Sequence, residues 1–157
     1  MTPADLTKLK NDILADPALA ALPNNDDGNF AIAAAYNLQA SPNWTVWKTS
    51  VDTAAAKDAI NWTEFIGRSQ GERDAFMFML SNHIINPARP NVRQGIQDIF
   101  SGPSGATSRN ALVALSKRFA TRAEKLFSTG TGSDASPATL TFEGTLSYSD
   151  VSAARTT

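Results

Sequence analysis

Residues 2–22 of the chain read TPADLTKLKNDILADPALAAL, and this stretch contains two helix start signals in succession. Thr2 precedes a proline and stands three residues before Asp5, a pattern typical of a capping box with proline in the first helical turn. The apolar residues that follow recur at helical spacing, at Leu6, Leu9, Ile13 and Leu14. Asp16-Pro17 repeats the start signal for a short second helix. The stretch therefore predicts a mainly α fold.

The same reasoning predicts further helices along the chain, interrupted by an extended or irregular piece at residues 43–51. A second capping box, Ser69 with Glu72, opens one of them. The expected helical segments are residues 30–38, 52–60, 61–65, 69–84, 92–100 and 107–127. The last is the longest, with an apolar stripe formed by Leu112, Leu115, Phe119, Ala123 and Leu126.

The composition changes after Phe127, where 13 of the last 30 residues are Ser or Thr. We therefore expect a small helical bundle over residues 1–127 and a Ser/Thr/Gly-rich linker with an extended C-terminal arm over residues 128–157. The arm is expected to form a weak β-hairpin and a short terminal helix. Its four large apolar residues are candidate interface anchors that need a covering surface, in their own domain or in a neighbouring copy: Leu140, Phe142, Leu146 and Tyr148.

Composition excludes several classes of site. The 157 residues include 15 acids, 14 bases, one histidine and no cysteine, which excludes disulfides, thiolate zinc sites and cysteine nucleophiles. The longest strongly apolar run, residues 75–80, is too short to cross a bilayer. We expect a soluble, cytoplasmic protein with no membrane partner and no cofactor.

The chain offers little for catalysis. Its mid-chain acids, Glu64, Glu72, Asp74 and Asp98, fit helix caps and surface ion pairs better than the paired carboxylates of a glycosidase. His83 stands alone near an expected helix end, and no G-x-S-x-G elbow occurs. We therefore expect no enzymatic activity and assign no catalytic, metal or cofactor-binding residue.

Four cations cluster on the last expected helix, at Lys117, Arg118, Arg122 and Lys125. Three of them follow helical spacing on one face, which would suit contacts with DNA phosphates or with an acidic partner. The alternative is a solvated helix face with cations favoured near the C-terminus. The acidic pI of about 5.7 argues against a dedicated nucleic-acid binder.

The three tryptophans, Trp44, Trp47 and Trp62, are candidate interface anchors, because Trp is enriched at contact surfaces. Core packing is the alternative for each of them, and a ligand cage is a third.

Several stretches resemble a family of small proteins encoded among the structural genes of tailed bacteriophages and prophages. The resemblance spans nearly the whole chain and rests on these strings: TPADLTKLKNDILADPALAALPNNDDGNFAIAAAYN from Thr2, VWKTSV from Val46, INPARPNVRQGI from Ile85, and RFATRAEKLF from Arg118 followed by STGTGSDASPATLTFEG. It implies a protein of the virion, present in the host cytoplasm before assembly, rather than an enzyme.

The implied role is a head-to-tail connector of the neck, or a tail-completion component. Such a protein would form a homo-oligomeric ring through a head-to-tail interface that closes, and would contact portal, capsid or tail proteins and DNA in a channel. Two alternatives remain open. One is a capsid decoration protein, and the other is a small phage regulator that binds nucleic acid through the four cations.

Overall fold

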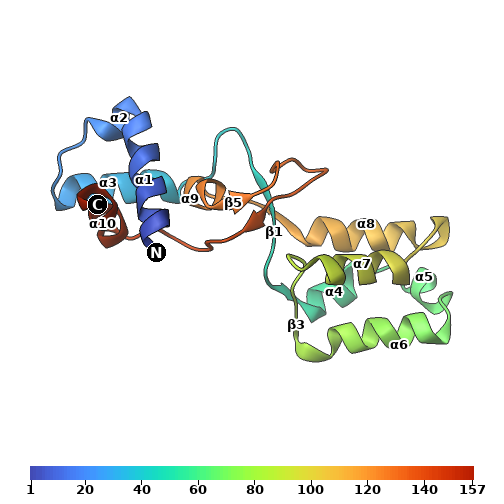
Figure 1. The fold of residues 1–157 in the computed structure, drawn as a ribbon. Helices are drawn as coiled ribbons and strands as arrows, with labels where there is room; N and C mark the ends of the chain where they lie inside the picture. Colours follow the sequence, from blue (N-terminus) through green and yellow to red (C-terminus); the bar gives the residue numbers. More distant parts are fainter. The chain divides into compact units, whose positions relative to one another are not determined.

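The computed structural model describes all residues 1–157 and contains ten α-helices and three two-stranded sheets (Figure 1). The strands are two or three residues long, so helices supply most of the regular structure. The expected mainly α fold is confirmed.

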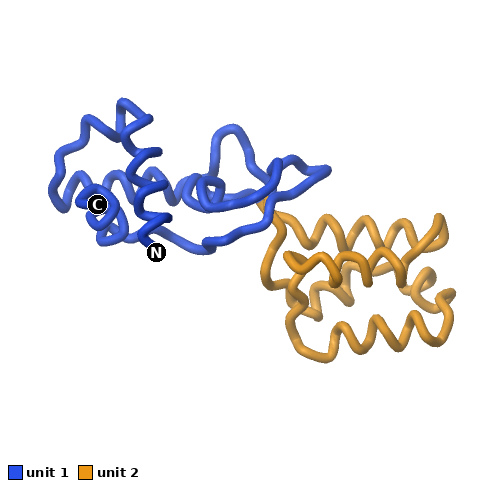
Figure 2. The backbone as a smooth tube through the Cα atoms, viewed as in Figure 1, with its two compact units in different colours: residues 1–45, 119–157 blue, residues 46–118 orange.

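The chain divides into two compact units (Figure 2). Unit 1 comprises residues 1–45 and 119–157, and unit 2 comprises residues 46–118. The chain passes from one unit to the other along two strands, β1 (Thr45–Trp47) and β4 (Lys117–Phe119), which pair with each other. This division differs from the boundary expected after Phe127, because both ends of the chain contribute to the same unit.

Unit 1 begins with the helices that the capping signals predicted. Thr2 and Asp5 form the capping box of the first helix, and the Asp16 carboxylate caps the second. The helices of the unit are α1 (Pro3–Ala15), α2 (Pro17–Ala20), α3 (Asp26–Asn37), α9 (Arg122–Leu126) and α10 (Tyr148–Thr156). Its remaining strands are β5 (Ser128–Thr129) and β6 (Thr139–Leu140), an antiparallel pair.

The C-terminal residues belong to the core of unit 1. Helix α10 packs against α1 and α3 and buries Val151 and Ala154, and Leu146 is buried just before it. The Arg155 guanidinium donates to the carbonyl oxygens of Leu22 and Pro23 at the loop before α3. The expected terminal helix is confirmed, but the extended arm is not observed, because Leu146 is buried and Leu140 and Phe142 are half-buried within their own chain.

The Ser/Thr/Gly-rich residues 130–138 form the loop of the β5–β6 hairpin and lie on Trp44. The backbone of Thr45 bonds to both sides of this loop, accepting from Ala138 and donating to Gly132 at 2.9 and 2.7 Å. Gly132 has φ +63°, and a Cβ there would lie 2.1 Å from the Trp44 indole. The glycine thus serves both a left-handed turn and a close approach.

Unit 2 is a group of five α-helices with short connecting elements. In chain order, the elements of the unit after β1 and before β4 are β2 (Val51–Asp52), α4 (Thr53–Ala59), α5 (Trp62–Ile66), α6 (Gln70–Met79), the 3₁₀ turn η1 (Leu80–Asn82), β3 (Ile84–Ile85), α7 (Pro90–Ile99), the 3₁₀ turn η2 (Pro103–Gly105) and α8 (Ala106–Leu115). Helix α7 contacts both α6 and α8 (Figure 1). Strand β2 pairs with β3. In the core of the unit, the ring of Phe76 packs against Phe65 at a tilt and against Phe100 edge-on.

The Glu64 carboxylate stabilises unit 2 by capping a helix from a distance. Helix α8 has no side-chain cap of its own at Gly105. Glu64 on α5 accepts hydrogen bonds from the backbone N–H groups of Thr107 and Ser108 at 3.1 and 2.8 Å. These bonds satisfy donors that the first turn of α8 would otherwise leave unpaired.

The prediction of one long helix over residues 107–127 is wrong. Helix α8 ends at Leu115, strand β4 follows, and α9 begins after a new capping box formed by Thr121 and Glu124. Between the helices the Ala120 N–H donates to the Trp44 carbonyl oxygen at 2.8 Å. Pairing with a distant part of the chain therefore overrides the local helical periodicity.

Candidate functional site

The break between α8 and α9 separates the four cations of the expected stripe. Lys117 and Arg118 lie on β4, whereas Arg122 and Lys125 lie on α9. The helical spacing that would have aligned them does not exist in the structure. The single cationic helix face is therefore an incorrect prediction.

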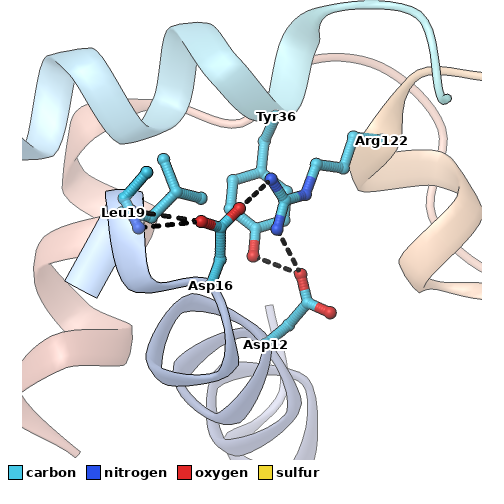
Figure 3. A network of polar contacts seen from close by, with 6 residues as sticks. Asp12, Asp16, Leu19, Tyr36 and Arg122 are labelled. Carbon is cyan, nitrogen blue, oxygen red and sulfur yellow. Dashed lines mark hydrogen bonds and ion pairs between the residues drawn. The ribbon is translucent and has the colours of Figure 1, made fainter.

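Arg122 forms the centre of a polar network in unit 1 (Figure 3). Its guanidinium donates to Asp16 Oδ2 at 2.8 Å and to Asp12 Oδ2 at 3.2 Å, and lies 4.5 Å from the centroid of the Tyr36 ring. The Tyr36 hydroxyl donates to the same Asp12 oxygen at 2.5 Å. The network connects α9 to α1 and α3, so Arg122 positions the helix that carries it.

The electrostatics of the network agree with this structural role. The hydrogen bond from Arg122 is the main cause that lowers the pKa of Asp16, aided by the N–H groups of Leu19 and Ala18. Burial of Tyr36, reinforced by its bond to Asp12, raises the pKa of the phenol well above its usual value. At neutral pH the arginine is charged and the tyrosine is neutral.

A groove of about 780 Å³ lies beside this network, within unit 1. We call it the unit 1 groove. Trp44 lines it and donates from Nε1 to Ser128 Oγ at 2.9 Å, while Lys125 Nζ lies 5.2 Å from the Trp44 ring centroid. Its walls are formed by Asp12, Asp16, Ala35, Leu38, Gln39, Ala40, Ser41, Trp44, Arg122, Lys125, Leu126, Ser128 and Gly130.

The unit 1 groove unites three of the predicted residues, Trp44, Arg122 and Lys125. Asp12 and Asp16 were not predicted as site residues, although their spacing of four residues at the end of an expected helix places both on one face. The two acids balance the two cations, and an indole face and aliphatic side chains lie beside them. This chemistry suits contact with a polar chain segment of a protein.

The other two tryptophans belong to unit 2 and have different surroundings. Trp47 is half-buried, with the Arg93 guanidinium 4.6 Å from its ring centroid. Trp62 is exposed at the start of α5, and its ring meets Phe65 edge-on at 5.3 Å. Trp62 therefore remains available for contact, whereas Trp47 is largely engaged within its own unit.

The predicted anchors of the C-terminal segment also separate into two groups. Leu146 is buried in the core, and the half-buried Phe142 packs on Phe127 with ring centroids 5.6 Å apart. Leu140 is half-buried on β6. Tyr148 is exposed and stacks on Phe30. Only Tyr148 of these four presents a large exposed surface.

A second groove, of about 650 Å³, lies within unit 2 among α6, β3 and α7. We call it the unit 2 groove. Phe78 and Ile84 line it with 79% and 55% of their surfaces exposed. This surface was not predicted, because Phe78 and Ile84 were placed on one helix over residues 69–84, whereas α6 ends at Met79 and Ile84 lies on β3.

Residues considered for catalysis have structural partners. Glu72 forms the capping box of α6 with Ser69, and Glu64 caps α8. His83 is exposed in a left-handed conformation with φ 59°, at the turn between α6 and β3.

None of the helices combines the length and the apolar character that crossing a bilayer requires.

Comparison with known proteins gives no match: no family model, curated protein or solved structure matches this chain.

Proposed function

We propose that this chain is a structural protein of tailed-bacteriophage particles, acting as a head-to-tail connector or tail-completion component. It would oligomerise and contact neighbouring virion proteins such as portal, capsid or tail proteins. The sequence resemblance supports the assignment to the particle. The exposed apolar surface supports an assembly role.

The distribution of large apolar side chains is the observation that carries the proposal. Many of them are exposed, on both units: Leu14, Phe30, Leu38, Trp62, Ile66, Met77, Phe78, Ile84, Phe119 and Tyr148. Isolated exposed apolar residues are normal, but apolar side chains gathered around a groove mark a contact site. Phe78 and Ile84 are gathered in this way at the unit 2 groove.

The regulator alternative has lost its main support. It rested on four cations clustered on one helix, whereas Arg122 binds two carboxylates and lies on a different element from Lys117 and Arg118. A capsid decoration protein would also expose apolar contact surfaces. Its location on the particle distinguishes it from a connector.

The direct test is the composition of purified particles. Phage should be grown from a genome that encodes this chain, and the particles analysed by quantitative mass spectrometry and immunogold electron microscopy. A fixed copy number with label at the head-to-tail junction or along the tail supports the proposal. Label over the shell would favour the decoration alternative, and absence from particles would refute a virion role.

A further inference from the structure

The lining of the unit 2 groove is partly apolar and exposed. Phe78 and Met79 at the end of α6 contribute to one part of its lining, and Ile84 of β3 and Val92 of α7 contribute to others. Phe78 extends into solvent at a helix position that no neighbouring element of unit 2 covers, as its 79% exposure shows. The polar part of the lining comes from Asn82, Asn86, Arg89, Asn91 and Asp98.

Unit 1 presents an aromatic group on its surface. Phe30 of α3 and Tyr148 at the start of α10 stack with their ring centroids 4.6 Å apart, yet remain 56% and 42% exposed. We call these two residues the aromatic pair. Acidic residues stand close by in the first turns of the same two helices, at Asp26, Asp27 and Asp150.

The two units have opposite net charges. Unit 1 contains nine acidic and five basic side chains, a net charge of −4, whereas unit 2 contains six acidic and nine basic side chains, a net charge of +3. Contact between the same unit of two copies would bring like charges together. Contact between unit 1 of one copy and unit 2 of another would bring opposite charges together, which favours that pairing and its rate of association.

We propose that the unit 2 groove binds the aromatic pair of a second copy of this chain, so that copies associate head to tail. This inference rests on the proposed assembly function and names its interface. Large aromatic side chains bury about 150–250 Å² each, and they dominate the energetics of interfaces. Around this anchor, Arg89 at the groove would lie near the acids of the partner's unit 1, while Asp98 disfavours close approach of those acids.

A head-to-tail contact has a distinctive consequence. Each copy would use one aromatic pair and one groove, so the contact repeats from copy to copy until a ring closes. A variant with a damaged pair still has an intact groove, and the reverse holds for a groove variant. Two such variants can therefore form one contact between them, and no more than one.

The test uses two full-length variants of the chain. The pair variant is Phe30→Ser with Tyr148→Ser, and the groove variant is Phe78→Ser with Ile84→Ser. All four side chains are exposed, so both variants should keep the wild-type circular dichroism spectrum, and the pair variant should lose only the small stabilisation of the Phe30–Tyr148 stack. The matched controls are Leu14→Ser in unit 1 and Ile66→Ser in unit 2, which are also exposed but lie outside the proposed contact.

Masses are measured by light scattering at matched concentrations. The wild type and both controls should assemble, and each double variant alone should remain at the monomer mass of 16.7 kDa. The equimolar mixture of the two variants should form a 1:1 dimer and nothing larger.

Three results would overturn the inference. If the double variants assemble like the wild type, the interface lies elsewhere, although the assembly function stands. If the mixture stays monomeric, the pair and the groove do not bind each other. If the wild type is monomeric throughout, the copies do not form this contact, and the particle composition then decides the proposed function separately.

Discussion

The side chain of Asn37 pairs with the backbone of Leu146 in both directions. Its Nδ2 donates to the Leu146 carbonyl oxygen at 2.9 Å, and its Oδ1 accepts from the Leu146 N–H at 2.8 Å. One amide thus satisfies both backbone groups of a residue 109 positions along the chain. The contact fixes the segment before α10 against the end of α3, which makes the C-terminal segment part of the unit 1 fold.

Leu146→Ala should strongly destabilise unit 1. The side chain is 3% exposed within the core, and truncating such a leucine costs about 2–5 kcal/mol in lost burial and cavity formation. Leu14→Ala is the matched control, because Leu14 is 61% exposed and should change the free energy of unfolding by less than about 0.5 kcal/mol. Urea unfolding followed by circular dichroism measures both. Equal effects would mean that the C-terminal segment does not pack as described.

Glu64→Gln should make stability less dependent on pH in the acidic range. The pKa of Glu64 is lowered from 4.5 to about 2, chiefly by the hydrogen bonds from Ser108 and then from Thr107. The unfolded state, which lacks these bonds, binds more protons than the folded state between these values. The carboxylate therefore stabilises the fold fully above about pH 4.5, and this contribution is lost as the pH falls towards 2.

The corresponding measurement is the melting temperature of wild type and variant from neutral pH down to acid. The variant should have a lower melting temperature than the wild type at neutral pH. The difference between the two melting temperatures should decrease as the pH falls. Asp74→Asn is the control, since its carboxylate accepts from the exposed side chain of Gln70 on the same helix. A difference in melting temperature that stays constant with pH would show that Glu64 does not act through its charge.

Gly132→Ala should destabilise unit 1 by more than about 1 kcal/mol, through both backbone strain and a clash with Trp44. The control is Gly71→Ala, because a Cβ at Gly71 meets nothing within 4 Å and helix α6 favours alanine there. Thermal unfolding should rank the variants with Gly71→Ala at or above the wild type and Gly132→Ala below it. Tryptophan fluorescence of the folded Gly132→Ala variant should also shift. An unchanged melting temperature would refute the close approach of loop and indole.

Arg122→Lys should lower the melting temperature even though it keeps the charge. Lysine lacks the planar fork that reaches Asp12 and Asp16 while lying over Tyr36. For a chain of this size, a loss of about 1 kcal/mol would lower the melting temperature by roughly 2–4 °C. Lys125→Arg is the control, since an arginine can keep the cation–π contact with Trp44. A variant as stable as the wild type would mean that the network does not hold α9 in place.

The sequence alone predicted those structural features that depend on residues close together in the chain. The capping boxes at Thr2 and Ser69 form as expected, because each needs only residues three positions apart. The mainly α class and the short terminal helix followed from the same kind of local signal.

The missed features depend on residues far apart in the chain. Nothing near Ser116 signals that the helix ends there, since the Lys117–Phe119 strand forms by pairing with Thr45–Trp47. Arg122 binds an aspartate 106 positions away, so its role in a network could not be read from helical spacing. The high Ser and Thr content suggested a free arm, although Leu146 was a sign of burial.

The proposed assembly is tested most directly by the absolute mass of the purified wild-type chain, measured by light scattering over a wide range of concentrations at low and high salt. We predict a mass that rises with concentration to a fixed multiple of 16.7 kDa, as a closed head-to-tail ring requires. A mass of 16.7 kDa at every concentration and salt would contradict self-assembly through the two units.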